Sequence, residues 1–487
     1  MAEQSLKEKT KKGLAWNLVE RFATEGVQFF FGILLARILS PDDYGLIAMP
    51  LVFLAIAQCF IDSGFSTALI RKPEIKEEDY STAFYFNIGV GVACYVVLFL
   101  SSPLIAKFYN QPILTDLLKF TALATLFNPL CAVQQAILTR EMDFRAQAII
   151  SLIGATISGV IGLFLAYKGF GVWSLVFQQV GGYVIRTILF WIIVKWRPIK
   201  TWSGESFRYL WGFGSKVLVQ GLISNIYENL YPIVIGKYYS ANDLGNYTRA
   251  RQFSKIPSTD VTGVLFRVVL PVFSNIQDDV ARLGSVFRRM IRLSAFCIFP
   301  LMLGLSAVAN PLVRVLLTDK WDGCIILLHF LCFNLMWYPI HAINLTILTA
   351  KGRSDLTLKL EIIKKVIGIA VLLLTVRHGI NWMVAAGIPA TLLGLIVNTY
   401  YTKRVVNIGL ISQLKELVPI FVSSIVMWGI VRLFISQFSN LYLQLFGGIF
   451  LGVVSYALMA KLFHKEEISN LISMLPERIK KVFVTKE

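Results

Sequence analysis

Long hydrophobic stretches alternate with short polar connections along almost the whole chain. Apolar runs of about 18 residues or more recur from residue 14 to residue 462, and each is long enough to cross about 30 Å of hydrocarbon as a helix. The pattern predicts about fourteen transmembrane helices and leaves no room for a separate soluble domain. The predicted spans are residues 14–39, 44–69, 82–106, 113–138, 146–167, 171–194, 212–236, 244–272, 288–311, 323–349, 356–376, 381–401, 414–436 and 441–462.

The charges in the connections predict how the chain is oriented. Alternate connections are rich in Lys and Arg, as in KEKTKK, RKPEIKEED, TREMDFR and KWRPIK, whereas the others, such as SPDD, KGFG and SANDLG, are not. Because cytoplasmic connections carry an excess of Lys and Arg, we expect the basic set and both termini to lie in the cytoplasm. The connections on the outer side are too short to form a folded domain.

Composition supports an all-α integral membrane protein. The 487 residues are 56% hydrophobic, and their mean hydropathy is +0.65. A net charge of +18 would suggest a nucleic-acid partner in a soluble protein, but here it follows from the basic connections, so we expect no nucleic-acid partner. The six Cys and four His residues show no metal-ligand spacing, so the sequence predicts no metal, no cofactor and no catalytic residue.

An internal repeat divides the chain. ILSPDDYG at residues 38–45 matches YYSANDLG at an offset of 200, and SPLI matches NPLV at 208. NPLCAVQQAILTR likewise matches YPIHAINLTILTA at an offset of 210. Three matches in the same order predict a duplication of six spans. We therefore expect six-helix bundles at 1–200 and 201–405, with two additional membrane helices and a basic cytoplasmic tail at 406–487.

Six spans per repeat give the two bundles the same orientation, as in transporters built from parallel repeats. A substrate cavity between the bundles is the expected consequence. At the offset of 200, the charged stretch LGNYTRARQFSKIPSTDVTGVLF aligns with the apolar second span, so we expect it to be a membrane helix as well.

That eighth span carries Arg249, Arg251, Lys255 and Arg267. Each cation near the bilayer centre costs about 2.5–3.5 kcal/mol on insertion scales, so these side chains must face water or counter-charges inside the protein. Lys255 lies nearest the centre of the span and is the strongest candidate. One interpretation is compensation by Glu20, Glu25 or Glu228, and the other is a binding site for an anion such as phosphate.

Acidic and amide residues on other spans extend this predicted polar wall. Glu20 and Glu25 lie on the first span, where Glu25 either pairs with Arg21 or takes a proton or Na⁺ during transport. Asn225 and Glu228 occupy the matching face of the seventh span. The remaining acidic candidates for ion coupling are Asp62, late in the second span, and Asp260, which has Arg267 as a possible ion-pair partner.

The motifs LLARILSPDDYGLIAM and FIDSGFSTALIRK resemble the opening of bacterial polysaccharide exporters of the colanic-acid type. These exporters belong to the multidrug/oligosaccharidyl-lipid/polysaccharide exporter superfamily, and the resemblance implies a MATE-like architecture. It further implies a flippase that moves a polyprenyl-diphosphate-linked oligosaccharide from the inner to the outer leaflet of the bacterial inner membrane. Arg249, Arg251, Lys255 and Arg267 would receive the anionic head group. The implied partners are the lipid-linked oligosaccharide, membrane lipids and the polysaccharide polymerase machinery.

Three other functions remain open from the sequence. One is a flippase for a lipid-linked peptidoglycan precursor, which binding assays with defined lipid-linked glycans would distinguish. A cation-coupled drug antiporter of the same superfamily would need acidic residues to dominate its cavity, and the cationic eighth span argues against it. A membrane glycan polymerase would need a catalytic cluster at the outer surface, where the connections are short. The sequence therefore favours a transporter over an enzyme, but it does not identify the glycan.

Overall fold

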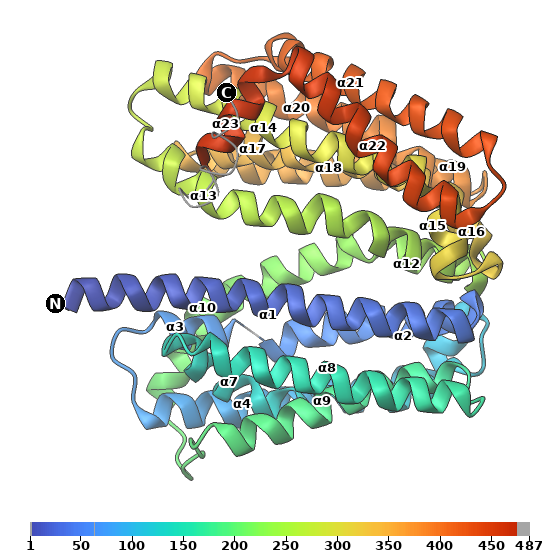
Figure 1. Cartoon of the computed structure of the whole chain (residues 1–487). Helices are drawn as coiled ribbons and strands as arrows, with labels where there is room; N and C mark the ends of the chain where they lie inside the picture. The colour runs from blue at the N-terminus through green and yellow to red at the C-terminus, as the bar shows by residue number, and fades with distance from the viewer. Residues whose placement is uncertain (1, 63, 475–487) are drawn as a thin grey trace. The chain divides into compact units, whose positions relative to one another are not determined.

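The chain is all-α. The computed structural model describes residues 2–62 and 64–474, and within these it gives no side-chain placement for residues 2–15, 17–19, 21, 260, 264–268, 270–271 and 472–474 (Figure 1). The described residues form helices joined by short connections and contain no β-strand. Their contacts separate the chain into two compact units, Met1–Gly245 and Asn246–Glu487. The predicted division at 200 and 405 stays a prediction. The part of the predicted basic tail that follows residue 474 lies outside the described residues.

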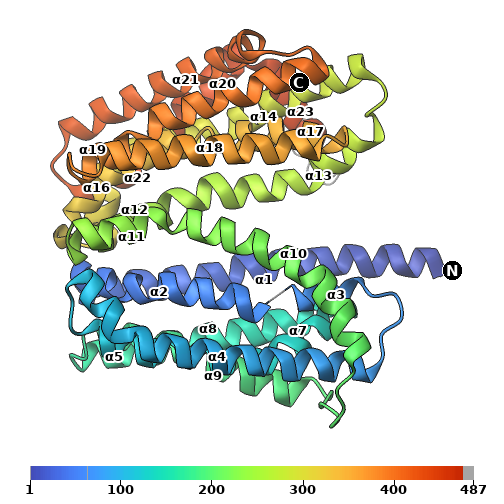
Figure 2. The same ribbon diagram turned by 180° about the vertical axis from the view of Figure 1, so that it is seen from behind.

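In the first unit, α1 packs along α8, α8 packs along α9, and α10 packs against α2, α3 and α4 (Figures 1 and 2). Its helices are α1 (Ala2–Ile38), α2 (Pro41–Asp62), α3 (Phe65–Arg71), α4 (Glu77–Tyr109), α5 (Leu114–Thr121), α6 (Ala124–Phe127), α7 (Pro129–Arg140), α8 (Phe144–Tyr167), α9 (Val172–Ile193), α10 (Gly204–Glu228) and α11 (Leu230–Tyr238). The next helix, α12 (Ala241–Lys255), begins in this unit and continues into the second.

In the second unit, α14 packs against α21, which in turn packs against α22, while α18 and α17 both contact α20 (Figure 2). Its elements are the π-helix η1 (Ile256–Asp260), α13 (Val261–Asn275), α14 (Val280–Ala307), α15 (Ala309–Leu316), the short helix η2 (Asp319–Trp321), α16 (Asp322–Leu335), α17 (Tyr338–Ala350), α18 (Ser354–Thr375), α19 (Ile380–Ala385), α20 (Gly387–Val406), α21 (Leu410–Gln437), α22 (Leu441–Phe463) and α23 (Lys465–Met474).

Several predicted spans are interrupted rather than continuous. The second span divides into α2 and α3 before Phe65, where Gly64 adopts a left-handed conformation with φ +67°. A Cβ atom on Gly64 would lie 2.9 Å from the Cα of Gly214 in α10, so only glycine permits both the turn and this approach. The fourth span bends by 42° where α7 begins at Pro129, because proline fits the first turn of a new helix but cannot continue an existing one.

The matched motifs of the internal repeat adopt the same local geometry. In the first copy, the hydroxyl of Ser40 donates to the Asp43 carboxylate at 2.7 Å, and the amide of Asp43 donates back to that hydroxyl at 3.2 Å. In the second copy, Ser240 and Asp243 form the same two hydrogen bonds at 2.7 and 3.0 Å. These bonds organise the starts of α2 and α12 by satisfying backbone groups that lie outside the helical ladder.

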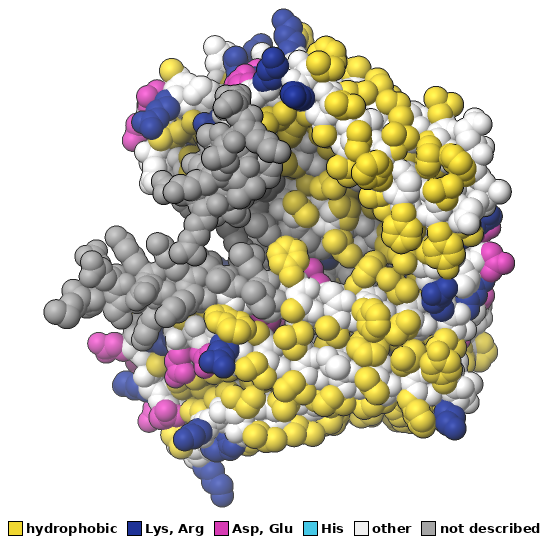
Figure 3. Space-filling model, in the orientation of Figure 1, with side chains coloured by type: hydrophobic (Ala, Val, Ile, Leu, Met, Phe, Trp, Pro, Cys, Tyr) yellow, Lys and Arg dark blue, Asp and Glu magenta, His cyan; other side chains and the backbone are white. Residues whose placement is uncertain are grey.

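The protein is a multi-pass membrane protein. Nine helical segments of the described chain are long and apolar enough to cross a membrane, or ten if the bent α5–α7 segment is counted as one span. Figure 3 shows hydrophobic side chains covering much of the visible surface, with charged side chains gathered towards its margins. A soluble protein rarely exposes so much apolar surface, whereas lipid is a favourable neighbour for it. The predicted total of fourteen spans stays a prediction.

Candidate functional site

Several helices of the described chain are not among its membrane-crossing candidates. They include α1, α10–α11, α12 with η1, and α18, and each of these carries several charged residues. A helix with charges along its length is costly to place against lipid, so such helices are expected to face the interior of a membrane protein or a water-filled space. The predicted site residues on α10 and α12 therefore lie on helices that are expected to face the interior or water.

A polar cavity of about 550 Å³ lies within the first unit. We call it the α2–α9 chamber, and α2, α3, α7, α9 and α10 all contribute to its wall. The lining residues are Gln58, Asp62, Gly64, Ser66, Thr67, Ile70, Asn128, Ala132, Gln135, Ala136, Thr139, Tyr183, Arg186 and Val217. This chamber is large enough to hold water molecules or part of a polar ligand among the helices of the first unit.

Arg186 supplies the positive charge of the chamber. Its Nε is buried and has no hydrogen-bond partner among the described residues. The side chain passes close to α8 at Gly154, where a Cβ atom would lie 2.8 Å from the Cγ of Arg186. Its charge attracts the carboxylate of Glu20 on α1, which also accepts a hydrogen bond of 3.1 Å from the hydroxyl of Ser151. A buried donor left without a partner is costly, so Arg186 is suited to receiving an anion or an acceptor group.

Amide side chains form another part of the chamber wall. The amide of Asn128, at the bend before α7, donates a hydrogen bond of 2.5 Å to the carbonyl oxygen of Gln58 in α2. Gln147 donates to the hydroxyl of Thr139 at 2.8 Å, which orients that hydroxyl at the edge of the chamber. The bend at Asn128 therefore brings polar groups of α7 into contact with those of α2.

The structure brings some of the predicted residues of the first unit to this chamber. Asp62 lines it directly, and Glu20 approaches it through Arg186. Asn225 instead joins α10 to α2, because its amide contacts the Sγ of Cys59 at 2.9 Å. Glu25 is half-buried in α1, and Glu228 is exposed at the end of α10. Neither Glu25, Glu228 nor Asn225 is among the residues that line the chamber.

The predicted cations of the second unit lie on one continuous helical segment. Arg249 and Arg251 are half-buried in α12, where Arg249 donates to the side-chain oxygen of Gln252, and Lys255 is exposed at the last residue of this helix. The charged stretch is thus a helix and not a loop, as the repeat predicted. The side chains of Asp260 and Arg267 lie outside the described residues, so their predicted pairing stays a prediction.

Lys255 directly precedes the π-helix η1, in which one extra residue is accommodated in a turn. Pro257 lies within this turn, and the hydroxyl of Ser258 donates a hydrogen bond of 2.6 Å to the carbonyl oxygen of Leu335 at the end of α16. Such π-turns inside helices frequently occur at functional sites. The helix geometry therefore changes directly after Lys255, the strongest candidate predicted from the sequence.

Arg186 is not among the functional residues predicted from the sequence. Its signal was nevertheless present, because Arg186 is the one charged residue in the apolar run 172–193. An ionisable residue in the middle of a membrane helix is a functional candidate by default. What the sequence did not contain was its neighbourhood, which comes from helices more than 100 residues away in the chain, such as α2.

Comparisons with known proteins place this arrangement among membrane proteins of polysaccharide biosynthesis. The model of the polysaccharide biosynthesis protein family matches residues 34–326. Lipopolysaccharide biosynthesis protein WzxC of Escherichia coli is 28% identical over 370 residues, which are 74% of either chain. Succinoglycan biosynthesis transport protein ExoT of Rhizobium meliloti is 24% identical over 490 residues, covering 96% of either chain.

Two solved structures show the likeness of the fold. The lipid II flippase MurJ in an inward closed conformation superimposes with a TM-score of 0.74 at 18% identity, over 93% of this chain and 99% of MurJ. An inward-facing MATE family transporter superimposes with a TM-score of 0.60 at 14% identity, over 81% of this chain and 98% of that transporter. At these identities, the likeness concerns the architecture of the helices.

Proposed function

This chain belongs to the polysaccharide biosynthesis protein family, and we propose that it is a flippase for a polyprenyl-diphosphate-linked oligosaccharide. The observation that carries the proposal is the match to the family together with full-length similarity to a transport protein of succinoglycan biosynthesis. A lipid-linked oligosaccharide combines a hydrocarbon tail with a large polar head group. A protein that moves it needs an apolar outer surface and a polar, cationic path within, because the diphosphate cannot cross hydrocarbon unassisted.

The cationic residues suit the diphosphate of this substrate. Arg249, Arg251, Lys255 and Arg267 would bind it on the eighth span, with Asn225 and Glu228 as further polar contacts. Arg186 adds a cation that is already held inside the first unit with an unused Nε donor among the described residues. Arginine matches phosphate oxygens with several donors at once, whereas lysine supplies a mobile point charge. Binding and release of the head would accompany alternating access to the two leaflets.

Ion coupling belongs to the same proposal. Glu20, Glu25, Asp62 and Asp260 are the candidates for taking up H⁺ or Na⁺, and Asp62 and Glu20 have the support of their positions at or near the α2–α9 chamber. The membrane potential would also assist, because a negative head moving outward gains about 2.3 kcal/mol per charge per 100 mV. The expected location is the bacterial inner membrane with both termini in the cytoplasm, next to the polymerase machinery that uses the exported unit.

Reconstitution in lipid vesicles tests the function. The probe is a fluorescent undecaprenyl-diphosphate-linked disaccharide, and a membrane-impermeant quencher measures how much of it reaches the outer leaflet. We expect the purified chain to speed this transfer relative to protein-free vesicles, and an inside-negative potential to speed outward transfer further. No acceleration, together with proton-driven efflux of a cationic dye, would favour the antiporter. Elongation of the disaccharide by the purified protein would favour the polymerase.

A further inference from the structure

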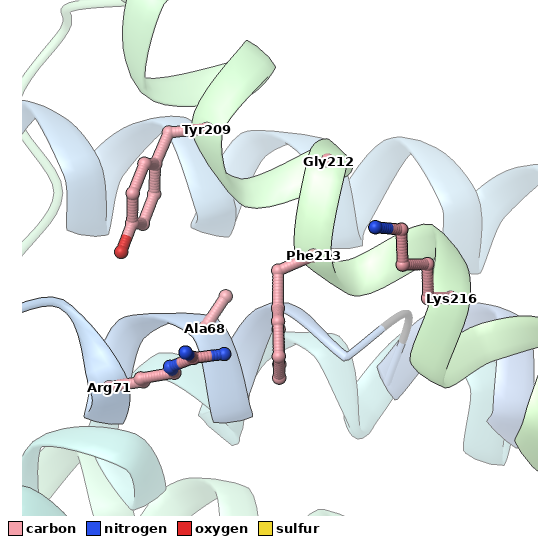
Figure 4. A pocket seen from close by; sticks show the side chains of 6 residues that line it. All are labelled: Ala68, Arg71, Tyr209, Gly212, Phe213 and Lys216. Atoms are coloured by element: carbon pink, nitrogen blue, oxygen red, sulfur yellow. The ribbon is translucent and has the colours of Figure 1, made fainter.

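A second cavity of about 360 Å³ lies between α3 and α10 in the first unit (Figure 4). We call it the α3–α10 pocket, and its lining residues are Ala68, Arg71, Tyr209, Gly212, Phe213 and Lys216. None of these residues lines the α2–α9 chamber. Figure 4 shows Arg71 reaching from α3 towards Phe213, and Lys216 turning back along α10 towards Gly212.

The two cations of this pocket have no carboxylate partner among the described residues. The guanidinium of Arg71 lies 5.1 Å from the ring centroid of Phe213, and no ion pair involves Arg71 or Lys216 within the described chain. The adjacent Lys72 differs, because its amine pairs with Asp79 at 2.7 Å. The pocket therefore presents two positive charges on an aromatic and apolar floor, with their counter-charge still to be supplied.

The surroundings of the pocket are those expected at a membrane–water interface. Tyr209 lines the pocket and is exposed. Trp202 and Trp211, near the start of α10, are exposed as well, and the Phe207 ring centroid lies 5.5 and 6.0 Å from theirs. Exposed Tyr and Trp side chains are typical of the head-group level of a bilayer. The connections that flank α3 and α10 here are RKPEIKEED and KWRPIK, which belong to the predicted cytoplasmic set.

An apolar track leads away from the pocket along α10. Val219, Ile223 and Ile226 are exposed and follow Lys216 at helical spacing on one side of the helix. A ligand that fits both parts would have an anionic head at Arg71 and Lys216 and a hydrocarbon chain along α10.

We propose that the α3–α10 pocket binds the phosphate-bearing head group of a lipid from the cytoplasmic leaflet. The shared chemistry is a phosphate attached to a hydrocarbon chain, and two sources can supply it. One is an anionic phospholipid of the bilayer. The other is the polyprenyl diphosphate carrier, which rests on the proposed function and would make the pocket a first contact before translocation. Arg71 donates to the phosphate from α3, and Lys216 neutralises it from α10.

Isothermal titration of the purified full-length chain in detergent tests the pocket. The probes are dioctanoyl phosphatidylglycerol for the phospholipid and farnesyl diphosphate for the carrier, with dioctanoyl phosphatidylcholine as the lipid without net charge. The paired variant Arg71→Gln and Lys216→Gln should weaken binding of the anionic probe about tenfold or more, because two charge-assisted contacts are lost. A matched pair, Lys195→Gln and Lys200→Gln, removes two exposed charges from the neighbouring connection and should leave binding unchanged.

A second variant removes the space without removing the charges. Gly212 lines the pocket and a Cβ atom on it meets nothing within 4 Å, so Gly212→Leu adds bulk at the pocket wall without a clash, and leucine is a better helix former than glycine. This variant should fold, and its affinity for the anionic probe should fall about as much as that of the paired variant. Weakened binding of phosphatidylglycerol alone identifies a phospholipid site, and weakened binding of farnesyl diphosphate alone identifies a carrier site. Unchanged affinity for both probes in both variants overturns the proposal, whatever the vesicle assay shows about translocation.

Discussion

Gly45 in α2 lies directly against the backbone of Ala241 in α12, and a Cβ atom on Gly45 would lie only 1.8 Å from the carbonyl oxygen of Ala241. The relationship is reciprocal, because a Cβ atom on Gly245 would lie 1.9 Å from the carbonyl oxygen of Pro41. A hydrogen bond of 2.8 Å from the amide of Asn242 to the carboxylate of Asp42 joins the same two helix starts. The two copies of the repeated motif thus contact each other through backbone.

Gly45→Ala should destabilise the protein. The methyl group would force the starts of α2 and α12 apart, and overpacking of this kind costs about 1–3 kcal/mol. Thermal unfolding of the detergent-purified chain measures the effect. Gly89→Ala in α4 is the matched control, because its Cβ meets nothing within 4 Å and alanine favours a helix by about 0.5–1 kcal/mol over glycine. Equal melting temperatures for Gly45→Ala and the unaltered chain would contradict the close contact.

Arg186→Gln should abolish most of the translocation measured in vesicles. The substitution keeps a hydrogen-bonding side chain but removes the one cation among the described residues that line the chamber. Loss of a charge-assisted contact to a diphosphate corresponds to about a tenfold to hundredfold loss of rate. Arg377→Gln, at an exposed connection after α18, should transport normally. Wild-type rates in Arg186→Gln vesicles, with equal amounts of inserted protein, would remove the chamber from the transport path.

Lys255→Ala should reduce glycan export while the protein remains in the membrane. Lys255 directly precedes the π-helix. Its replacement would remove one electrostatic contact to the proposed diphosphate and weaken binding of that group about tenfold. Lys255→Arg keeps the charge and should restore much of the export. The control is Lys461→Ala, which removes an exposed charge near the end of α22. If the alanine and arginine variants export equally well, the charge of Lys255 plays no part in binding.

Acid should destabilise the end of the second unit where α22 meets α23, through His464. This residue follows α22, is 3% exposed, and hydrogen-bonds through Nε2 to the hydroxyl of Ser423 at 3.0 Å. Burial lowers the pKa of His464 from its ordinary value of 6.5, although the nearby carboxylate of Glu467 opposes this shift. The unfolded chain therefore binds a proton more readily than the folded chain, so stability falls as pH drops below about 6.5 towards the lowered pKa.

His464→Gln tests this pH dependence, because glutamine can bond to Ser423 without titrating. The melting temperature of the variant should fall less between pH 7.5 and pH 5.5 than that of the unaltered chain. Arg292 faces the same region and pairs with Glu416, Glu466 and Glu467, and these groups are retained in both proteins. Their contribution to the acid response therefore cancels in the comparison, and an identical decrease in both proteins would exclude His464 as a cause.

The sequence predicted the class of the fold well because hydropathy reports directly on the bilayer. The all-α membrane architecture and the family resemblance were both confirmed. The two copies of the repeated motif also share local structure, since Ser40–Asp43 and Ser240–Asp243 form the same pair of hydrogen bonds. Each of these results depends on residues that are close together in the chain or on an average over many residues.

The interruptions and the chamber could not be predicted in the same way. A hydropathy average scarcely distinguishes a straight helix from one that is broken at Gly64 or bent before Pro129, because the mean apolar character is similar. The cavity around Arg186 depends on those breaks, since the bend at Asn128 is what brings its amide to Gln58. Prediction of the site therefore required the geometry of helices that are distant in sequence.

The π-helix between α12 and α13 has a mechanical consequence. A regular helix advances about 100° per residue, so a turn that contains one additional residue offsets the faces of the helices on its two sides. If the wide turn migrates by one residue, a side chain passes from one side of it to the other and rotates, while nearly every backbone amide keeps a partner. Because lipid cannot replace lost backbone hydrogen bonds, this shift would let a charged segment such as the one ending at Lys255 reorient at low energetic cost.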